Sequence, residues 1–362
     1  MSLQRIADET GVSPSTVSRV VNNKHAGKVS EATRTRILEV ARAMHYQPNP
    51  QAVALATGRP PNTLGLVIPY YSHTFRSFYF SEISSGVLDT AGRHRIDVNL
   101  LVHHDDTTEG YRRLVSGNRV AGVVLFGGVS NETAISACRA AGVPFVVVNR
   151  DSADRDVPSV GSDNEGGGYD ATRHLIRLGH TRIAFITGPA GRPDADGRYQ
   201  GYRRAMEEAG LSVVPGLVAQ GDYSEKGGRE AMRQLLAQSP RPTALFAAND
   251  QSAIAAMAVI KRAGLRVPQD IAVVGFDDIP LAQHVEPALT TIHQPTYRMG
   301  QRAAEMLMAS IGADGAGLNE SEEQILRTRL VVRESCGARR SPDAETDQAI
   351  RHDTPAGRPL MS

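Results

Sequence analysis

Polar side chains suited to binding a small polar molecule recur just after apolar runs in the second half of the chain. Asn249 follows the apolar run 244–248, and Asp277 lies two residues after the run 271–275. Amides and carboxylates, together with the guanidinium of Arg198, form directional and often paired hydrogen bonds. Neighbouring hydroxyl groups of a sugar suit such pairs, so these residues are candidates for a sugar-binding site.

Aromatic and further polar residues extend this candidate set. Tyr223 and Phe276 offer rings for the apolar face of a sugar, and residues 149–151 (Asn-Arg-Asp) follow the apolar run 144–148. Asn and Asp also favour turns and helix caps, so each position alone has a purely structural explanation. Because the set is expected to converge at one edge of two sheets, we favour a binding cleft.

Three other patterns raise enzymatic or metal-binding alternatives. Asp277 and Asp278 resemble the paired carboxylates of a glycosidase, but consecutive loop residues do not flank a scissile bond. Residues 103–106 (His-His-Asp-Asp) are more typical of an exposed strand end than of a metal site. The glycines 166–168 lack the lysine of a phosphate-binding loop and favour a closely packed helix start. The sequence therefore predicts no enzymatic activity, no cofactor and no bound metal.

Apolar strands alternate with helices from residue 64 onward. We expect strands at 64–69, 96–102, 122–126, 144–148, 182–186, 244–248 and 271–275, and helices at 80–91, 108–116, 132–141, 169–178, 198–209, 225–236 and 251–263. This alternation is typical of an α/β protein with parallel sheets covered on both faces. A break near 151–161 divides the pattern into two doubly wound lobes. Ligands of such sheets bind outside the carboxyl ends of the strands, so two facing lobes would form a cleft there.

The N-terminal residues have the pattern of two short helices around a tight turn. Gly11 suits the turn, Ser13 suits the cap of the second helix, and Pro14 suits its first position. A cap at Ser30 predicts a third helix. This arrangement predicts a helix-turn-helix headpiece.

The second helix of this headpiece has one apolar face and one polar face. Val17, Val20 and Val21 follow i, i+3, i+4 spacing and predict the buried face. The side chains left for the opposite face are Ser15, Ser18, Arg19 and Asn22. Polar and cationic side chains on a short, firmly packed helix suit the major groove of DNA.

Charge supports a nucleic-acid partner, although an ordinary solvated helical domain would also carry mixed charge. Residues 1–60 hold eight Lys and Arg against four Asp and Glu, a formal charge of +4, whereas the whole chain is +1. The rest of the chain therefore sums to −3, and positive charge is concentrated where phosphate would be contacted.

One more short helix is predicted after the headpiece. Asn49, Pro50 and Gly58 mark its start and end, and it is too short to be stable alone.

Length and composition set the remaining limits. A chain of 362 residues fits two or three domains, and no run of 18 apolar residues predicts a membrane span. We expect no signal peptide, and we expect Cys138 and Cys336 to be free thiols in a reducing cytoplasm. The composition of residues 338–362 predicts a disordered tail.

Nine segments resemble the lactose-repressor/galactose-repressor (LacI/GalR) family of bacterial transcription regulators. They are residues 6–22, 46–49, 163–167, 178–183, 201–205, 248–250, 274–278, 290–295 and 330–334. The match runs in order from about residue 2 to residue 337. It implies a cytoplasmic homodimer that binds near-palindromic operator DNA and is switched by a small-molecule effector.

The resemblance also implies a domain organisation with a core like periplasmic sugar-binding proteins. The parts are the headpiece 1–48, a hinge helix and linker 49–60, a two-lobed core 61–337 and the tail 338–362. The chain would cross three times between the lobes. The N-lobe would take about 61–160 and 291–322, and the C-lobe about 161–290 and 323–337.

Residue roles follow from the same resemblance. Bases would be read by Pro14, Ser15 and Arg19, and phosphates contacted by Ser13, Thr16, Ser18 and Asn22. The hinge helix would place Ala52 and Leu55 in the minor groove, with Leu55 as a wedge between base pairs. The effector would contact Arg198, Tyr223, Asn249, Asp277 and Gln294.

The resemblance predicts a repressor whose effector is a sugar or sugar derivative, with a purine or another non-sugar co-repressor as the alternative. Val53 stands where many family members carry arginine, so one phosphate contact is expected to be missing. The core alone would also suit a plain sugar-binding or transport module. The headpiece argues against that rival.

Overall fold

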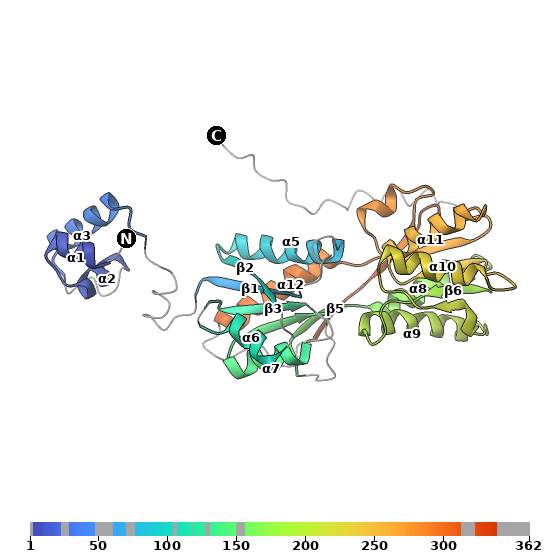
Figure 1. Cartoon of the computed structure of the whole chain (residues 1–362), viewed down its shortest axis with the longest axis horizontal. Helices are drawn as coiled ribbons and strands as arrows, with labels where there is room; N and C mark the ends of the chain where they lie inside the picture. Colours follow the sequence, from blue (N-terminus) through green and yellow to red (C-terminus); the bar gives the residue numbers. More distant parts are fainter. Residues whose placement is uncertain are drawn as a thin grey trace.

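The computed structural model describes residues 3–22, 29–47, 61–69, 77–103, 107–117, 119–126, 131–149, 156–312 and 323–338. The predicted hinge helix with Ala52 and Leu55, and the predicted tail beyond Ala338, lie outside these residues. Within them, a small helical unit precedes two sheets that carry helices on both faces (Figure 1). None of the described helices is long and apolar enough to cross a membrane.

The headpiece contains three helices around one core. They are α1 (Leu3–Thr10), α2 (Pro14–Val21) and α3 (Glu31–Ala43). Gly11 has φ +70° in the turn before α2, a conformation that side chains disfavour. Ser13 caps α2, because its Oγ accepts a hydrogen bond from the backbone N–H of Thr16 at 3.3 Å. The core consists of Ile6, Ala7, Val17, Val20, Ile37 and Ala41.

The first lobe is built on a six-stranded parallel sheet. In spatial order its strands are β11 (Glu323–Leu326), β5 (Ser159–Ser162), β4 (Phe145–Val148), β3 (Gly122–Phe126), β1 (Thr63–Pro69) and β2 (Asp97–His103). One face is covered by α5 (Phe78–Arg93) and α12 (Thr296–Gly312), the other by α6 (Thr108–Val115) and α7 (Asn131–Ala141). The central strands β3 and β4 are apolar along their length because helices bury both of their faces.

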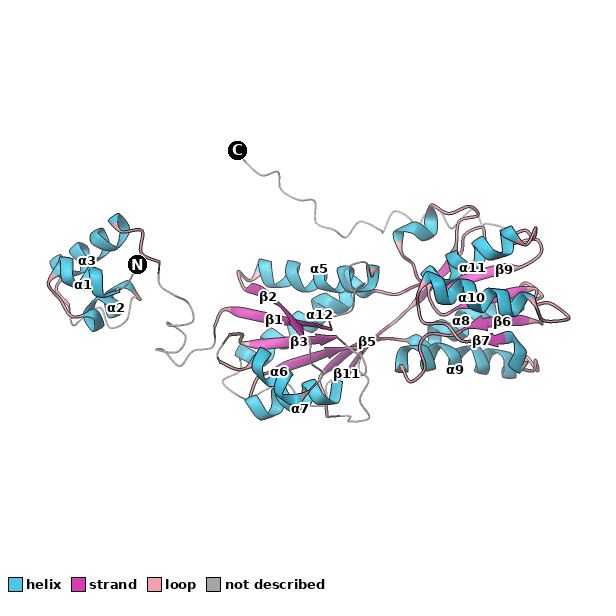
Figure 2. Cartoon of the chain, in the orientation of Figure 1, coloured by secondary structure: helices cyan, strands magenta, loops and turns pink. Residues whose placement is uncertain are grey.

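The second lobe repeats this plan with one antiparallel edge strand. Its order is β12 (Arg329–Val331), β10 (Thr290–His293), β9 (Ala272–Asp277), β8 (Ala244–Ala247), β6 (Ile183–Ile186) and β7 (Val218–Ala219). One face carries α8 (Asn164–Arg177) and α9 (Pro193–Glu208), the other α10 (Glu225–Leu236) and α11 (Asp250–Arg262) (Figure 2). Short 3-10 turns lie at Pro215–Leu217 (η3) and Pro280–Gln283 (η4).

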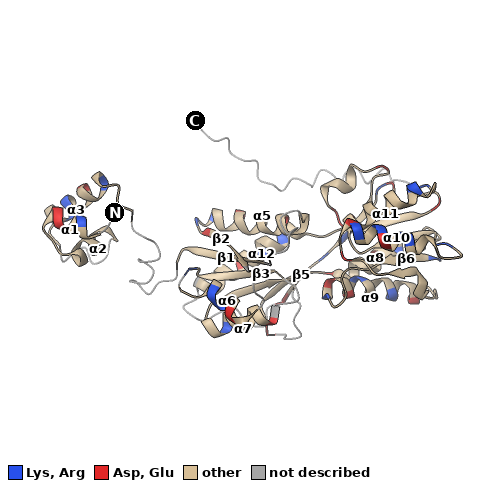
Figure 3. Ribbon diagram, viewed as in Figure 1, with Lys and Arg blue, Asp and Glu red and all other residues tan. Residues whose placement is uncertain are grey.

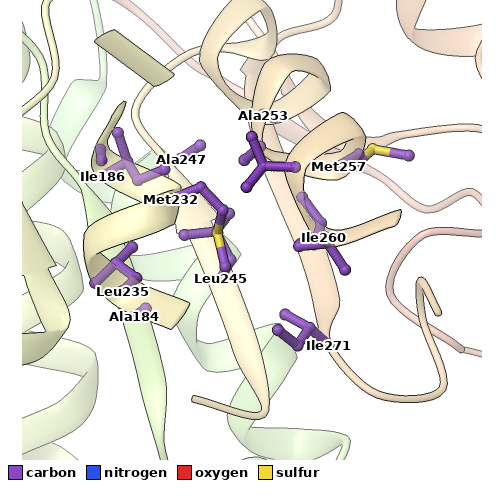
Figure 4. Close-up of a cluster of buried hydrophobic side chains, with 14 of the residues drawn as sticks. Ala184, Ile186, Met232, Leu235, Leu245, Ala247, Ala253, Met257, Ile260 and Ile271 are labelled. Atoms are coloured by element: carbon purple, nitrogen blue, oxygen red, sulfur yellow. The ribbon is translucent and has the colours of Figure 1, made fainter. Parts of the chain in front are cut away.

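Buried apolar side chains join the helices of the second lobe to its sheet. Met232 and Leu235 of α10, with Met257 and Ile260 of α11, pack on strand residues such as Leu245 (Figure 4). All of these side chains are at most 3% exposed. The framework that carries the strand ends is therefore well packed, and the predicted α/β fold class is confirmed.

The chain passes between the two sheets three times: after β5, after β10 and after β11. The predicted division was wrong at these passages. Residues 161–162 and 323–326 lie in the first sheet, and 291–293 lie in the second. The reason is strand pairing: β11 adds to the edge of the first sheet through β5, and β10 pairs with β9 before the chain leaves.

All seven predicted strands are present, with ends within two residues of the predicted ones. Two helices begin five residues earlier than predicted. Asp163 caps α8 by accepting a hydrogen bond from the N–H of Gly166 at 2.7 Å, and Pro193 starts α9. The run of glycines at 166–168 concealed the first of these starts, because glycine disfavours helix interiors.

Candidate functional site

Three neighbouring strands of the second lobe end in polar residues. Asn249 follows β8, Asp277 is the last residue of β9, and Gln294 follows β10. These strands are parallel neighbours, so their carboxyl ends meet at one edge of the sheet. Gln294 Nε2 donates a hydrogen bond to Asp277 Oδ1 at 3.1 Å, and Arg198 Nη1 lies 3.6 Å from the same oxygen. The structure therefore brings Asp277, Gln294 and Arg198 together.

Arg198 is held in place by α9 and by contacts on several sides. Its side chain is 3% exposed, Nη1 donates to the carbonyl of Ala248 at 2.5 Å, and Nε donates to Asn164 Oδ1 at 3.0 Å. Burial opposes the charge of Arg198, but nearby Tyr223 and Asp277 raise the pKa of its guanidinium. A fixed cation therefore faces the carboxylate of Asp277.

Phe276 does not offer a ring to a ligand, contrary to the sequence-based expectation. Its side chain is fully buried, and the guanidinium of Arg198 lies over the ring at 3.8 Å from the centroid. A Cβ on Gly167 would approach the ring edge to 2.7 Å, so α8 covers it as well. The strand period explains the difference, because Phe276 and Asp277 point to opposite faces of β9.

Asp277 is a strained and strongly perturbed carboxyl. Its φ of +114° is disfavoured for any residue with a side chain, and such strain concentrates at functional sites. Burial raises the pKa of Asp277 to about 7, Arg198 lowers it and Asp194 raises it. Its charge therefore changes near neutral pH.

Asp250 is a second buried carboxyl behind this edge of the sheet. It is fully buried and accepts hydrogen bonds from the Thr291 hydroxyl at 2.5 Å and the Ile279 N–H at 2.9 Å. Burial and the charge of Asp277 raise its pKa, so the two carboxyls disfavour each other's ionised forms. Asp250 supports the turn after β9.

Tyr223 reaches the same region from the loop after β7. Its hydroxyl donates to Asp194 Oδ2 at 3.0 Å, and Asp194 Oδ1 accepts a hydrogen bond from Arg192 Nε at 3.0 Å. A Cβ on Gly188 would meet the Tyr223 ring at 2.3 Å, so only glycine leaves room for the ring there. Tyr223 itself has φ +67°.

Asn249 has protein partners at both ends of its amide. Oδ1 accepts a hydrogen bond from the N–H of Ser252 at 3.0 Å and caps α11, and Nδ2 donates to the carbonyl of Tyr223 at 3.0 Å. The predicted site residue thus fixes the loop that carries Tyr223.

The first lobe contributes polar groups to this region. Tyr79 lies in α5, and its hydroxyl accepts a hydrogen bond from Asn149 Nδ2 at 2.6 Å. Burial raises the pKa of Tyr79 and Asp194 raises it further, whereas Arg192 and Arg198 lower it. Charges of the second lobe therefore act on a hydroxyl of the first. Of the predicted residues 149–151, only Asn149 belongs to the described part of the chain, where it has φ +52°.

Sequence reasoning missed three residues of this region: Ser162, Arg192 and Asp194. Pro193 is a helix-start signal that would have placed Arg192 at the N-cap and Asp194 in the first turn of α9. Ser162 ends a strand that has no apolar run, so no pattern marked it.

The geometry does not support paired catalytic carboxylates. Asp278 bonds to His293 Nδ1 at 3.0 Å and to Arg333 Nη2 at 2.5 Å, whereas Asp277 faces Arg198. Among the described residues, no group of three or more His, Cys, Asp and Glu side chains is placed to hold a metal ion. A Cβ on Gly168 would lie 2.3 Å from the Arg198 carbonyl oxygen, so this glycine permits close packing of α8 on α9.

In the headpiece, α2 presents its polar side chains away from the core. Val17 and Val20 are buried, whereas Pro14 and Ser15 are exposed at the start of the helix. Arg19 lies along this face, with Nη2 3.4 Å from Thr16 Oγ1. Arg residues occur on all three headpiece helices (Figure 3). Ser18 and Asn22 are partly exposed and bonded to each other at 3.3 Å.

Two protein-family models match the chain. The one described as "Bacterial regulatory proteins, lacI family" matches residues 2–49, and the one described as "Periplasmic binding protein-like domain" matches residues 172–336. The HTH-type transcriptional regulator CelR of Thermobifida fusca is 35% identical over 341 residues, which cover 92% of this chain and 98% of CelR. The HTH-type transcriptional repressor CytR of Escherichia coli (strain K12) is 33% identical over 340 residues, covering 93% of this chain and 96% of CytR.

Solved structures agree with these relatives. A CelR–cellobiose complex is 34% identical, has a TM-score of 0.71 and covers 92% of this chain and 99% of its own. A lac repressor dimer bound to operator and the anti-inducer ONPF is 28% identical and has a TM-score of 0.77. The match covers 93% of this chain and 99% of the lac repressor chain. The relatives are DNA-binding transcriptional regulators and not enzymes. This chain belongs to the lacI family of bacterial regulatory proteins.

Proposed function

We propose that this regulator is a homodimeric repressor that binds near-palindromic operator DNA and changes its operator affinity when a sugar or sugar derivative binds between its lobes. The observation that carries the effector class is the group formed by Arg198, Asp277 and Gln294 at one sheet edge. A guanidinium, a carboxylate and an amide offer both donors and acceptors to vicinal hydroxyls. The 34% identity to the chain of the CelR–cellobiose complex supports this class.

We assign effector contacts to Arg198, Tyr223, Asn249, Asp277 and Gln294. Asp277 has a more exposed side chain than Arg198, 16% against 3%, and is the best placed to accept hydroxyl hydrogen bonds. The other four side chains would contact the effector and also hold the site together, because each already forms a hydrogen bond to another part of the protein. Tyr79 and Asn149 would meet the ligand from the first lobe.

On the DNA side, α2 would lie in the major groove with Pro14, Ser15 and Arg19 toward the bases. Ser13, Thr16, Ser18 and Asn22 would contact phosphates. The N-terminal end of α2 adds its partial positive charge to these contacts. Pro14 has no side-chain hydrogen-bonding group, so Ser15 and Arg19 would carry most of the base discrimination. A hinge helix with Ala52 and Leu55 in the minor groove completes the proposal.

Exposed apolar side chains mark the surface for a second copy of the chain. Leu88 on α5, Leu100 on the edge strand β2 and Leu281 on η4 are 48%, 50% and 52% exposed. Leu88 and Leu100 lie on contacting elements of the first lobe, and Leu281 lies in the second lobe. Large exposed apolar side chains are typical of interaction surfaces. The solved lac repressor dimer, with the same fold, supports a homodimer.

The switch would act through the three passages between the lobes. A ligand that contacts both lobes binds one of their relative placements better than the other, and only this difference shifts the equilibrium. The chain enters the first lobe at residue 61, after the headpiece and the linker, so a change in that lobe would be transmitted to the DNA-binding unit.

The test begins with operator fragments selected from genomic DNA by the purified protein. Fluorescence anisotropy then measures operator affinity with cellobiose, other sugars and, for the purine alternative, hypoxanthine. We expect a sugar to change the affinity in the wild type and in Asp170→Asn, an exposed control on α8, but not in Asp277→Asn. A response to hypoxanthine alone would replace the sugar assignment, and failure to enrich any two-fold-symmetric sequence would overturn the DNA-binding proposal.

A further inference from the structure

Ser162 and Gln294 meet where two of the three passages leave their sheets. Ser162 is the last residue of β5 in the first sheet, and Gln294 directly follows β10 of the second. Although 132 positions separate them in sequence, Ser162 Oγ donates to Gln294 Oε1 at 2.5 Å. The side chains are 5% and 1% exposed, so water does not readily replace this contact.

The same amide also touches the proposed effector site. Gln294 Oε1 accepts from Ser162, and Gln294 Nε2 donates to Asp277 Oδ1 at 3.1 Å. Asp277 Oδ1 in turn lies 3.6 Å from Arg198 Nη1. One side chain therefore bridges a hydroxyl of the first lobe and a carboxyl of the second.

We propose that Ser162 is a positioning residue whose hydroxyl holds the Gln294 amide against Asp277 and so couples the placement of the lobes to the hydrogen bonding of this carboxyl. Its role in the effector response rests on the proposed function. The coupling itself follows from the two hydrogen bonds. If the lobes move apart at these passages, the amide loses one anchor, and its hydrogen bond to the carboxyl is weakened.

The consequence for Asp277 has a definite direction. A hydrogen bond donated to a carboxyl favours its ionised form, and the bond from Gln294 lowers the pKa of Asp277. A buried amide that loses one partner shifts toward another, because unpaired polar groups are disfavoured in the interior. Loss of the Ser162 hydroxyl therefore weakens the donor and raises the pKa of Asp277.

Other charged groups face Asp277 and remain unchanged by substitution at Ser162. They are Arg198 and Asp194 of α9, Asp250 of α11 and the Tyr79 hydroxyl of α5. Arg198 favours the ionised carboxyl, whereas Asp194 and Asp250 disfavour it. A shift in the titration of Asp277 in a Ser162 variant therefore reports on the amide.

The test is a titration that needs no effector. In the full-length protein, aspartate carboxyls are labelled with ¹³C, and the Asp277 resonance is identified by its absence in Asp277→Asn. We expect a wild-type midpoint near pH 7 and, in Ser162→Ala, a midpoint higher by about half a unit or more. Ser159→Ala is the matched control: it lies on the same strand, is 1% exposed, and its Oγ has no hydrogen-bond partner among the described residues.

A second pair of variants separates the hydroxyl from the space that it fills. Ser162→Thr keeps a hydroxyl and is expected to titrate like the wild type, whereas Ser162→Val has the same shape without it and is expected to shift upward. Equal midpoints in the threonine and valine variants, or in Ser162→Ala and Ser159→Ala, would overturn the proposal. Because the titration contains neither DNA nor sugar, its outcome is independent of whether the protein releases an operator.

Discussion

The two recognition surfaces of this regulator are built in opposite ways. On α2, the side chains proposed to read DNA stand on the outer face of a helix and make few contacts beyond that helix. In the proposed effector site, Arg198, Asp277 and Gln294 are nearly buried, bonded across several elements and partly strained. The exposed side chains of α2 are free to adapt to DNA, whereas the side chains of the proposed effector site are held in place before a small ligand binds.

This contrast predicts where substitutions affect folding as well as binding. Removing a group from the buried site leaves its partners unpaired, so stability and ligand binding are lost together. Removing a group from the exposed face of α2 changes binding alone. The predictions below test this separation.

The largest effect is expected from Arg198→Met. At pH 8 the carboxylate of Asp277 would lose its neighbouring cation, and the free energy of unfolding is expected to fall by about 3 kcal/mol or more, as for other broken buried pairs. Urea unfolding measures this loss, and sugar binding should disappear with it. Arg204→Met, also on α9, is the control: it removes exposed pairs with Glu165 of α8 and Glu208 of α9 and should change stability by less than about 1 kcal/mol.

Arg19→Ala is expected to weaken operator binding without changing stability. A good side-chain contact to a base contributes about 1–3 kcal/mol of discrimination, which corresponds to roughly a tenfold to hundredfold loss of affinity. Anisotropy against the operator and against a scrambled duplex measures affinity and specificity together. Arg5→Ala, on the exposed side of α1, removes the same charge elsewhere on the headpiece. If the two variants lose the same affinity for both duplexes, Arg19 contributes only charge.

The pH dependence of stability is a further test that separates the buried site from the exposed face of α2. The pKa of Asp277 is about 7 in the folded chain and about 4 when unfolded, so the folded state binds more protons between these values. Stability relative to Asp277→Asn should therefore decrease as pH rises from about 5 to about 7, with a slope of at most about 1.4 kcal/mol per unit, and then level off. Sugar affinity should change in the opposite direction, because the ionised carboxyl accepts hydroxyl hydrogen bonds.

Urea midpoints of the two proteins at matched pH values measure the stability difference. Asp170→Asn, which removes an exposed carboxyl on α8, should run parallel to the wild type over the same range. A wild-type curve parallel to that of Asp277→Asn would show that Asp277 titrates alike in the folded and unfolded states.

The same contrast explains what could be predicted from the sequence. Strands such as β3 and β8 are short apolar runs buried on both faces, so their positions are visible without any partner. β5 (Ser-Val-Gly-Ser) and β11 (Glu-Gln-Ile-Leu) carry no such run and are defined by their pairing with each other. The position of Asp277 at a strand end was predictable, and Gln294 followed from the family resemblance, but the contact from Ser162 depends on which chain passages adjoin.

The α2 face was predictable for the opposite reason. The turn, the cap and the apolar face are all local signals within about ten residues, so the helix and its polar side could be assigned from spacing alone. Asp194 shows the limit of such signals in the buried site. Its first-turn position was readable from Pro193, but its bonds to Tyr223 and Arg192 required the fold.

The smallest effect is expected from replacing the two serines that cap α2 and α3 of the headpiece. Ser13 Oγ accepts from the N–H of Thr16 at 3.3 Å, and Ser30 Oγ accepts from the N–H of Thr33 at 3.2 Å. Replacing either serine by alanine should destabilise its helix by about 1 kcal/mol, which amide hydrogen exchange of α2 and α3 in the full-length protein measures. Only Ser13→Ala should also weaken operator binding beyond what the loss of helix stability explains, because only Ser13 is proposed to contact phosphate. If both variants lose the same small amount of affinity, Ser13 acts only as a helix cap and does not contact DNA. In that case the effect of Ser13 on binding comes from helix stability alone.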